Sequence, residues 1–256
     1  MSPQPDLDPL ERVAVEVAAA WGLELGPPFA LSRYSFVAPA GEDAVLKVTP
    51  PEDDESDEEA DALALWDGDG AVRLLRHDRG RRALLLERAR PGNDISTLPD
   101  DEATAIAVEI GLRLWRPAGE PFRWLGDHVP RWLDAAERSN QEGRELIPLA
   151  RELYGSLDVG RATLVHRDFH HHNILDAGEQ YVAIDPKPML GEPEYDVPSF
   201  LWNPLPYRMR PDVTERRIAA FAAAGLDEHR IRAWTAIRGA YLGADPDEVK
   251  VLRALL

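Results

Sequence analysis

The sequence predicts an α+β fold, in which a small antiparallel sheet with one inserted helix precedes a larger, mainly helical part. Two observations support this prediction. Residues 29–88 consist of short apolar stretches separated by polar turns, which is typical of strands joined by hairpins. From Asp100 onward, apolar residues recur every three or four positions, as in amphipathic helices. With 256 residues, 44% of them hydrophobic, the chain can bury a core in one domain or in two lobes.

The N-terminal part is expected to start with a helix and to continue into the strands of the sheet. Asp8, Pro9 and Glu11 supply a cap, a first-turn proline and a capping-box partner for this helix. The inserted helix is expected to start in the acidic run 52–61 and to continue through Trp66. Four strands are expected at residues 29–38, 44–48, 71–75 and 82–87.

The rest of the chain is expected to be helical except around one hairpin. A helix is predicted to begin at Asp100, and further helices are predicted within residues 130–154, 215–224 and 227–242. The stretch 87–92 has the character of a hinge between the two parts. We therefore predict one lobe over residues 1–88 and a second lobe over residues 89–256.

The most informative stretch begins at Leu164 and ends at Asp185. It predicts a strand end, a polar loop that carries Asp168 and Asn173, and a hairpin whose second strand ends at Asp185. These three groups are the ones that phosphoryl transfer from a nucleotide requires. The first carboxylate orients the attacking hydroxyl and takes its proton, while the amide oxygen and the second carboxylate hold magnesium. A loop that serves only its own turn is the alternative, and the coincidence of these features disfavours it.

Composition narrows the class of partners. The net charge of −17 opposes binding to nucleic acid and to anionic membranes, and it would attract cationic ligands. No apolar run is long enough to cross a membrane, and the N-terminus lacks the basic and then apolar pattern of a signal peptide. The chain also has no cysteine. We therefore expect a cytoplasmic protein without a membrane or nucleic-acid partner.

The polar loop resembles that of a known enzyme class. The order His-Arg-Asp, with Asn173 five positions after Asp168, is similar to the catalytic loop of protein kinases. The histidine at 170 and the later Ile-Asp-Pro around Asp185 resemble more closely the aminoglycoside phosphotransferases, which share the protein-kinase fold but phosphorylate small molecules. Residues 65–75 and 183–192, with their Asp-Pro-Lys and Gly-Glu sequences, resemble the streptomycin and hydroxyurea phosphotransferase branch of this family. The resemblance extends from about residue 45 to residue 203.

This resemblance implies a protein-kinase-like fold with two lobes and a kinase that requires ATP and Mg²⁺. The enzyme would transfer the γ-phosphate to an alcohol group of a small molecule. By the same resemblance, Asp168 is the catalytic base, and Asn173 and Asp185 are magnesium ligands. Asp196, in the Tyr-Asp pair, is expected to support the catalytic loop.

Nucleotide-binding residues are expected in the first lobe. Lys47 interrupts an apolar strand, where a lysine is costly unless a charged partner meets it. Kinases pair such a lysine with a glutamate of the inserted helix and aim it at the α- and β-phosphates. Glu59 is the expected partner, with Glu58 and Glu55 as alternatives. The hinge backbone at Glu87 and Ala89 is expected to bind the adenine edge.

Two features depart from the kinase pattern, and one suggests another chemistry. Residues 31–37 lack the glycines of a protein-kinase phosphate loop, and Arg167 replaces the glycine usual in the aminoglycoside kinases. Backbone amides near 32–35 are still expected to contact the nucleotide. The consecutive histidines 170–172, with His166, could instead hold zinc in a hydrolase. Three consecutive side chains do not converge easily on one metal, and this disfavours zinc.

The acceptor is expected to be cationic, in the manner of a streptomycin-type aminoglycoside. Carboxylates at Glu192, Glu194, Asp134 and Glu137 would suit such a ligand, and Trp202 could stack on a sugar ring. A metabolic amino sugar or amino alcohol is the alternative acceptor, and a pseudokinase that binds nucleotide without turnover is the alternative function. Either a monomer or a homodimer is compatible with the sequence.

Overall fold

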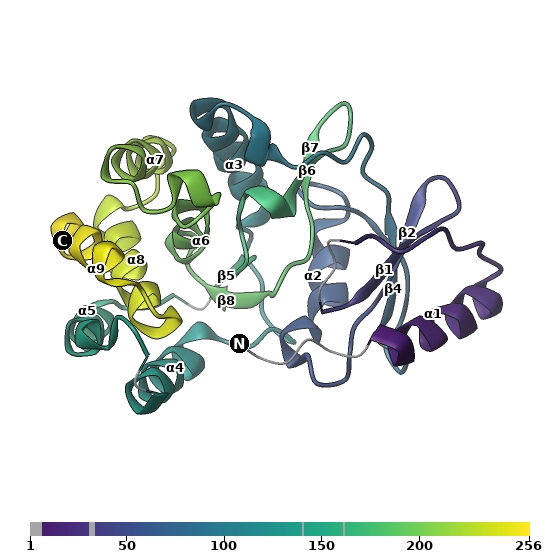
Figure 1. Ribbon diagram of the computed structural model, residues 1–256, viewed down its shortest axis with the longest axis horizontal. Helices are drawn as coiled ribbons and strands as arrows, with labels where there is room; N and C mark the ends of the chain where they lie inside the picture. The colour runs from purple at the N-terminus through teal and green to yellow at the C-terminus, as the bar shows by residue number, and fades with distance from the viewer. Residues whose placement is uncertain (1–6, 31–33, 140, 161) are drawn as a thin grey trace. The chain divides into compact units, whose positions relative to one another are not determined.

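The computed structural model describes residues 7–30, 34–139, 141–160 and 162–256, which group into two compact units (Figure 1). The first unit contains the chain up to Asn93 and the segment Leu175–Lys187. The second unit contains Asp94–Ile174 and Pro188–Leu256. Because an antiparallel sheet occupies the first part of the chain and most helices follow later, the fold is of the predicted α+β class.

The hairpin segment 175–187 groups with the first unit, although the sequence places it inside the expected second lobe. Backbone hydrogen bonds account for this grouping. The Val72 amide donates to the Ala183 carbonyl at 3.0 Å, and the Gly92 amide donates to the Asp176 carbonyl at 2.9 Å. These bonds satisfy polar backbone groups that the short hairpin cannot satisfy alone.

The first unit is built on a four-stranded antiparallel sheet in the order β1-β2-β4-β3. Apolar side chains of α1, among them Val17, pack with Ala38 and Leu46 of the sheet in one buried cluster. Its helices and strands are α1 (Leu7–Trp21), β1 (Phe36–Ala40), β2 (Ala44–Val48), α2 (Glu59–Trp66), β3 (Leu74–Asp78), β4 (Ala83–Glu87) and the hairpin strand β7 (Tyr181–Ala183), which pairs with β6 (Ile174–Asp176).

Three elements of this unit differ from the sequence expectation. The first strand begins at Phe36 rather than at residue 29, because Phe36 lies opposite Val48, the last residue of β2. It ends at Ala40, before the turn at Gly41. The third strand begins three residues later than expected, where its register with β4 shifts. Helix α2 begins only at Glu59, and the acidic run before it forms a short 3-10 turn, Asp54–Ser56. Repulsion between closely spaced carboxylates disfavours a regular helix there.

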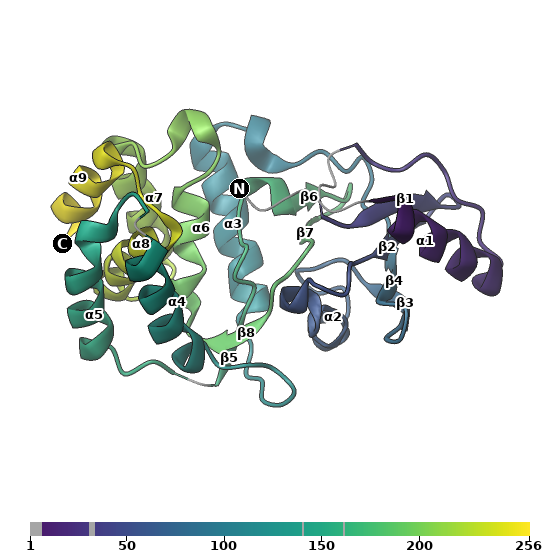
Figure 2. The same cartoon turned by 60° about the horizontal axis from the view of Figure 1, so that its bottom comes forward.

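The second unit is mainly helical, and α8 lies at its centre. Helices α4, α5, α6, α7 and α9 all contact α8 (Figure 2), which explains why residues on all sides of α8 are buried. A two-stranded sheet joins β5 to β8. The elements are α3 (Asp100–Leu114), α4 (Leu125–Ser139), α5 (Ile147–Ser156), β5 (Thr163–Val165), β8 (Met189–Gly191), α6 (Val197–Leu201), α7 (Pro211–Ala223), α8 (Glu228–Leu242) and α9 (Pro246–Leu255).

The expected helical stretch 130–154 forms two helices. Helix α4 starts before Pro130, and Pro148 stands in the first turn of α5, where a missing amide hydrogen is tolerated. Helix α9 was not expected, although Asp245 and Glu248 form a capping box at its start. No helix in the described part of the chain is both long enough and apolar enough to span a bilayer.

Candidate active site

In the first unit, three expected site residues meet around one ammonium group. Strand β2 carries Lys47 in its buried part, and α2 begins with Glu59. The Lys47 Nζ donates to both carboxylate oxygens of Glu59 at 2.7 Å and to Oδ1 of Asp185 at 2.5 Å. The ion pair expected between Lys47 and Glu59 is therefore present, and Glu59 rather than Glu58 or Glu55 is the partner.

The charge on Lys47 is stabilised by these partners. Burial favours the neutral amine, but the Asp185 and Glu59 carboxylates outweigh this effect and raise the pKa of Lys47 above its ordinary value. The ammonium is thus held in one place and stays charged at neutral pH. A positive charge fixed in this way suits an anionic ligand such as phosphate.

Asp185 lies just beyond the end of β7 in a left-handed backbone conformation, with φ 55°. This conformation costs about 1–2 kcal/mol for a residue other than glycine. Its side chain remains 39% exposed although two lysines contact it. A strained and partly exposed carboxylate of this kind is characteristic of functional sites.

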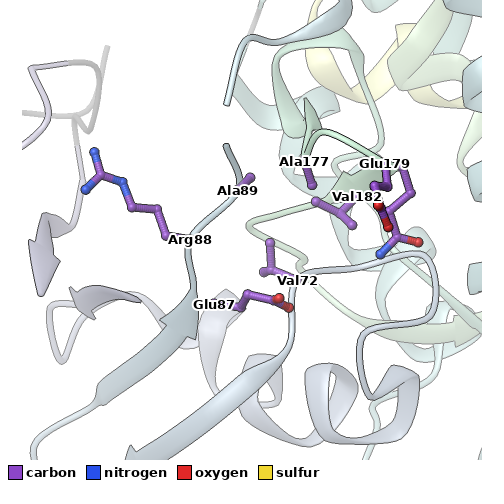
Figure 3. A pocket seen from close by; sticks show the side chains of 8 residues that line it. Val72, Glu87, Arg88, Ala89, Ala177, Glu179 and Val182 are labelled. Atoms are coloured by element: carbon purple, nitrogen blue, oxygen red, sulfur yellow. The ribbon is translucent and has the colours of Figure 1, made fainter. Parts of the chain in front are cut away.

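A cavity of about 550 Å³ lies within the same unit, next to the expected hinge. Both Glu87, the last residue of β4, and Ala89 contribute to its lining, whereas the Arg88 side chain points away from the hairpin residues (Figure 3). The full lining comprises Val72, Glu87, Arg88, Ala89, Ala177, Glu179, Gln180 and Val182. Val72 and Val182 offer apolar contacts, and the polar groups that make up most of the lining offer hydrogen bonds, a combination that suits a heterocycle. Residues 32 and 33 of the expected phosphate loop lie outside the described residues.

In the second unit, the loop after β5 brings Asp168 and Asn173 together. The Asn173 Nδ2 donates to the Asp168 carbonyl at 2.9 Å and to its Oδ2 at 3.1 Å. A 3-10 turn, His171–Asn173, positions the amide, and the His170 Nδ1 accepts a bond from the His172 amide at its start. The Asp168 side chain remains 41% exposed, so a ligand can reach its carboxylate.

Asp196 supports this loop, as expected. Its carboxylate accepts bonds from the His166 and Arg167 amides at 2.8 and 2.6 Å and from Trp115 Nε1 at 2.8 Å. Burial raises the pKa of Asp196, although the three donors oppose that change. Asp196 thus fixes the backbone immediately before Asp168.

Arg167 adopts a left-handed backbone with φ 71°, a conformation that glycine adopts without strain. Its carbonyl accepts bonds from Ser199 Oγ and Arg238, and its guanidinium lies 5.1 Å from the ring centroid of Trp132. The Trp132 contact has no local signal in the sequence, because α4 and the loop are distant in the chain. The arginine places a positive charge beside Trp132 of α4.

The four histidines around the loop have different environments. His171 is stacked on Phe200 and accepts a contact from Arg217, whereas His172 pairs with Asp94 at 2.9 Å. His170 approaches Asp168 at 3.4 Å, and His166 is packed edge-on to Phe169. Among the residues that the structure describes, no group of three histidines or carboxylates is arranged to hold a metal. The divergent side chains therefore do not favour the zinc-hydrolase alternative.

The carboxylates expected to bind a cationic acceptor have internal partners instead. Glu192 pairs with Arg230 at 2.5 Å and accepts a bond from Trp234. Glu194 accepts a bond from the Asp227 amide, while Asp134 and Glu137 both pair with Arg151. Trp202 is packed close to Gly239 of α8. These residues stabilise the second unit, so that expectation finds no support in the geometry.

The donor groups fit magnesium. Hard divalent cations prefer carboxylate and amide oxygens. The side-chain hydrogen bonds of Asn173 with described residues all use its Nδ2, so the other atom of the amide, Oδ1, is the one that could meet a cation. Asp185 presents a partly exposed carboxylate. Bound magnesium would supply the positive charge that neutralises phosphate oxygens.

Comparison with known proteins identifies the family. Residues 30–249 match the family model described as aminoglycoside/hydroxyurea antibiotic resistance kinase. The chain belongs to this family. It is thus an ATP-dependent phosphotransferase with a hydroxyl group as acceptor, as predicted.

Two relatives cover most of the chain. The hydroxyurea phosphotransferase of Kitasatospora aureofaciens is 35% identical in an alignment 242 residues long that covers 88% of this chain and 69% of the relative. The streptomycin 6-kinase of Streptomyces glaucescens is 32% identical in an alignment 251 residues long that covers 88% of this chain and 79% of the relative. Both belong to the branch that the sequence motifs indicate.

Solved structures confirm the fold. The choline kinase LicA from Streptococcus pneumoniae superimposes with a TM-score of 0.65 at 12% identity, covering 95% of this chain and 90% of LicA. At this identity the likeness concerns the fold alone. The predicted protein-kinase-like α+β fold is confirmed.

Proposed function

We propose that this family member transfers the γ-phosphate of ATP, in the presence of magnesium, to a hydroxyl group of a streptomycin-type aminoglycoside. The observation that supports the phosphate chemistry best is the buried Lys47 ammonium held by Glu59 and Asp185. A lysine fixed in this way keeps a positive charge in one place, where it can meet phosphate oxygens. The relatives that phosphorylate streptomycin support the acceptor class.

In this proposal each polar group of the site has one task. Asp168 accepts the proton of the acceptor hydroxyl as the oxygen attacks the γ-phosphorus. Asn173 and Asp185 hold magnesium, and Lys47, positioned by Glu59, neutralises the α- and β-phosphates. The backbone at Glu87 and Ala89 binds the adenine edge, which the cavity beside these residues supports.

A second candidate acceptor is a small hydroxyl compound without positive charge, such as hydroxyurea. The carboxylates that would attract a cation are paired internally, and Arg167 lies over Trp132 next to Asp168 in the sequence. Burial and the charges of Arg123, Arg131 and Arg167 lower the pKa of His128 in α4, which indicates a positive potential there. Such a potential repels a polycation, and one relative is a hydroxyurea phosphotransferase.

Acceptor-dependent ADP formation distinguishes these candidates. Purified protein with magnesium and ATP is incubated separately with streptomycin, hydroxyurea, glucosamine and ethanolamine, and mass spectrometry identifies the phosphorylated product. The proposal predicts that streptomycin stimulates ADP release and gains one phosphate. Stimulation by hydroxyurea alone would favour the uncharged acceptor, and stimulation by glucosamine or ethanolamine would favour a metabolic role. Nucleotide binding without turnover on any acceptor would favour a pseudokinase.

A further inference from the structure

Lysine is rare in this chain, and two of the lysines lie beside the same carboxylate. Only Lys47, Lys187 and Lys250 occur among 29 basic residues, and all the others are arginines. Lys47 and Lys187 both contact the same oxygen, Oδ1 of Asp185, at 2.5 and 3.4 Å. A chain that uses arginine almost everywhere has thus placed two of its three lysines against one carboxylate. A compact ammonium, rather than a planar guanidinium, is what these two positions require.

The Lys187 side chain is held by the acidic run. Its Nζ lies 3.0 Å from Ser56 Oγ and 3.6 Å from Asp53 Oδ2, and Ser56 donates to Asp53 at 2.7 Å. Residues 53, 56 and 59 are the three positions of this run that share these inward contacts, and they are spaced three apart as on one side of a helical turn. The carboxylates at 52, 54, 55 and 57 are exposed. The acidic run therefore positions both lysines, a role beyond the one expected for Glu59.

The geometry leaves Lys187 able to bind a further anion. An ammonium has three donor hydrogens. Within the described residues, Lys187 donates to Ser56 Oγ at 3.0 Å and, at the longer distance of 3.4 Å, to Asp185 Oδ1, while Asp53 Oδ2 lies 3.6 Å away, so two of the three donor hydrogens are used. Asp185 is already engaged closely by Lys47.

We propose that Lys187 is a second phosphate-binding lysine, which contacts the terminal phosphate of a nucleoside triphosphate and is positioned by Ser56 and Asp53. The proposal rests on the proposed function, in which Asp185 and Lys47 belong to the triphosphate site. Lys47 neutralises the α- and β-phosphates there, so the added ammonium serves the γ-phosphate, the most highly charged group. The site therefore distinguishes a triphosphate from a diphosphate.

Calorimetric titration with magnesium and either AMP-PNP or ADP tests this inference on the full chain. Lys187→Met removes a charge-assisted contact worth about 1.5–3 kcal/mol, which corresponds to a loss of AMP-PNP affinity of roughly 10- to 100-fold. ADP affinity is expected to stay within about 2-fold. Ser56→Ala keeps the lysine but removes its closest partner, and it is expected to weaken AMP-PNP binding selectively as well. Lys250→Met, at an exposed lysine of α9 paired with Asp247, is the matched control and leaves both affinities unchanged.

The outcomes separate this inference from the proposed function. Unchanged AMP-PNP affinity in Lys187→Met, or an equal loss for AMP-PNP and ADP, overturns the assignment to the terminal phosphate. If Lys187→Met does not fold, as judged by circular dichroism, the selectivity of Ser56→Ala decides in the same way. By contrast, a wild-type protein that binds neither nucleotide, or a Lys47→Met variant that binds both normally, contradicts the proposed function itself.

Discussion

Two residues at the site have a strained backbone conformation, and hydrogen bonds hold one of them in place. Asp185 and Arg167 both adopt left-handed backbone angles, each at a cost of about 1–2 kcal/mol relative to an ordinary conformation. Neighbouring bonds hold the strained peptide at Arg167: Asp196 accepts from its amide, and Ser199 and Arg238 donate to its carbonyl. Strain that is maintained by several hydrogen bonds fixes the side chain that follows, Asp168.

Replacing Asp196 tests this support. Asp196→Asn turns one acceptor oxygen into an NH₂ group that faces a backbone N–H donor, so at least one buried bond is lost. The free energy of unfolding is expected to fall by about 1–3 kcal/mol in urea denaturation, and kcat is expected to fall with it. Asp247→Asn, at an exposed position of α9, is the control and leaves both quantities unchanged. Equal behaviour of the two variants would mean that Asp196 does not support the loop.

Some residues of the site were predictable and others were not. Lys47 and Glu59 could be paired from the sequence, because a lysine in an apolar strand requires a carboxylate and a helix with acidic residues follows. Lys187 had no such signal, since its partner Ser56 lies 131 positions away and no periodicity connects them. The ion pairs of Glu192 with Arg230 and of Asp134 with Arg151 could not be predicted either. The chain has many arginines, and only the fold determines which of them meets a given carboxylate.

Among the elements, the β6–β7 hairpin contributes several residues of the proposed nucleotide site to the first unit. Gly178 forms its turn with φ 91°, and its amide donates to Asp176 Oδ1 at 2.7 Å. The neighbouring Ala177 and Glu179 line the cavity, and Asp185 follows the second strand. The turn conformation therefore determines the position of several residues of the proposed nucleotide site.

Gly178→Ala is expected to disturb this element. The new Cβ would lie 3.2 Å from the Arg90 carbonyl in an unfavourable left-handed conformation, so we expect a loss of stability of roughly 1–2 kcal/mol. ADP affinity, measured by calorimetry, is expected to fall as well. Gly155→Ala in α5 meets no atom within 4 Å and should instead raise stability by about 0.5–1 kcal/mol. A gain of stability in both variants would exclude strain at Gly178.

Most helices and strands were predictable because local patterns determine them, but several boundaries depend on partners. The start of β1 follows from its pairing with β2, and the start of β3 follows from a register shift against β4. Neither pairing is visible in a local window. Helix α9 is a different case, since the Asp245 and Glu248 of its capping box form a local pattern that is visible in the sequence.

At the scale of the whole molecule, the family and the protein-kinase-like fold follow from the motifs, and the comparisons confirm both. The lobe boundary after residue 88 stays a prediction. The acceptor remained beyond sequence reasoning, because it depends on which charged side chains the fold leaves for a ligand. Cytoplasmic location and oligomeric state also stay predictions.

The central claim is that Asp168 is the base of a phosphotransferase. The most direct test compares acceptor-stimulated ADP release by the wild type and by Asp168→Asn, with AMP-PNP affinity measured on the same samples. We expect kcat to fall roughly 10²- to 10⁴-fold with nucleotide affinity preserved, since the amide cannot accept the hydroxyl proton. Turnover at the wild-type rate in Asp168→Asn would contradict it.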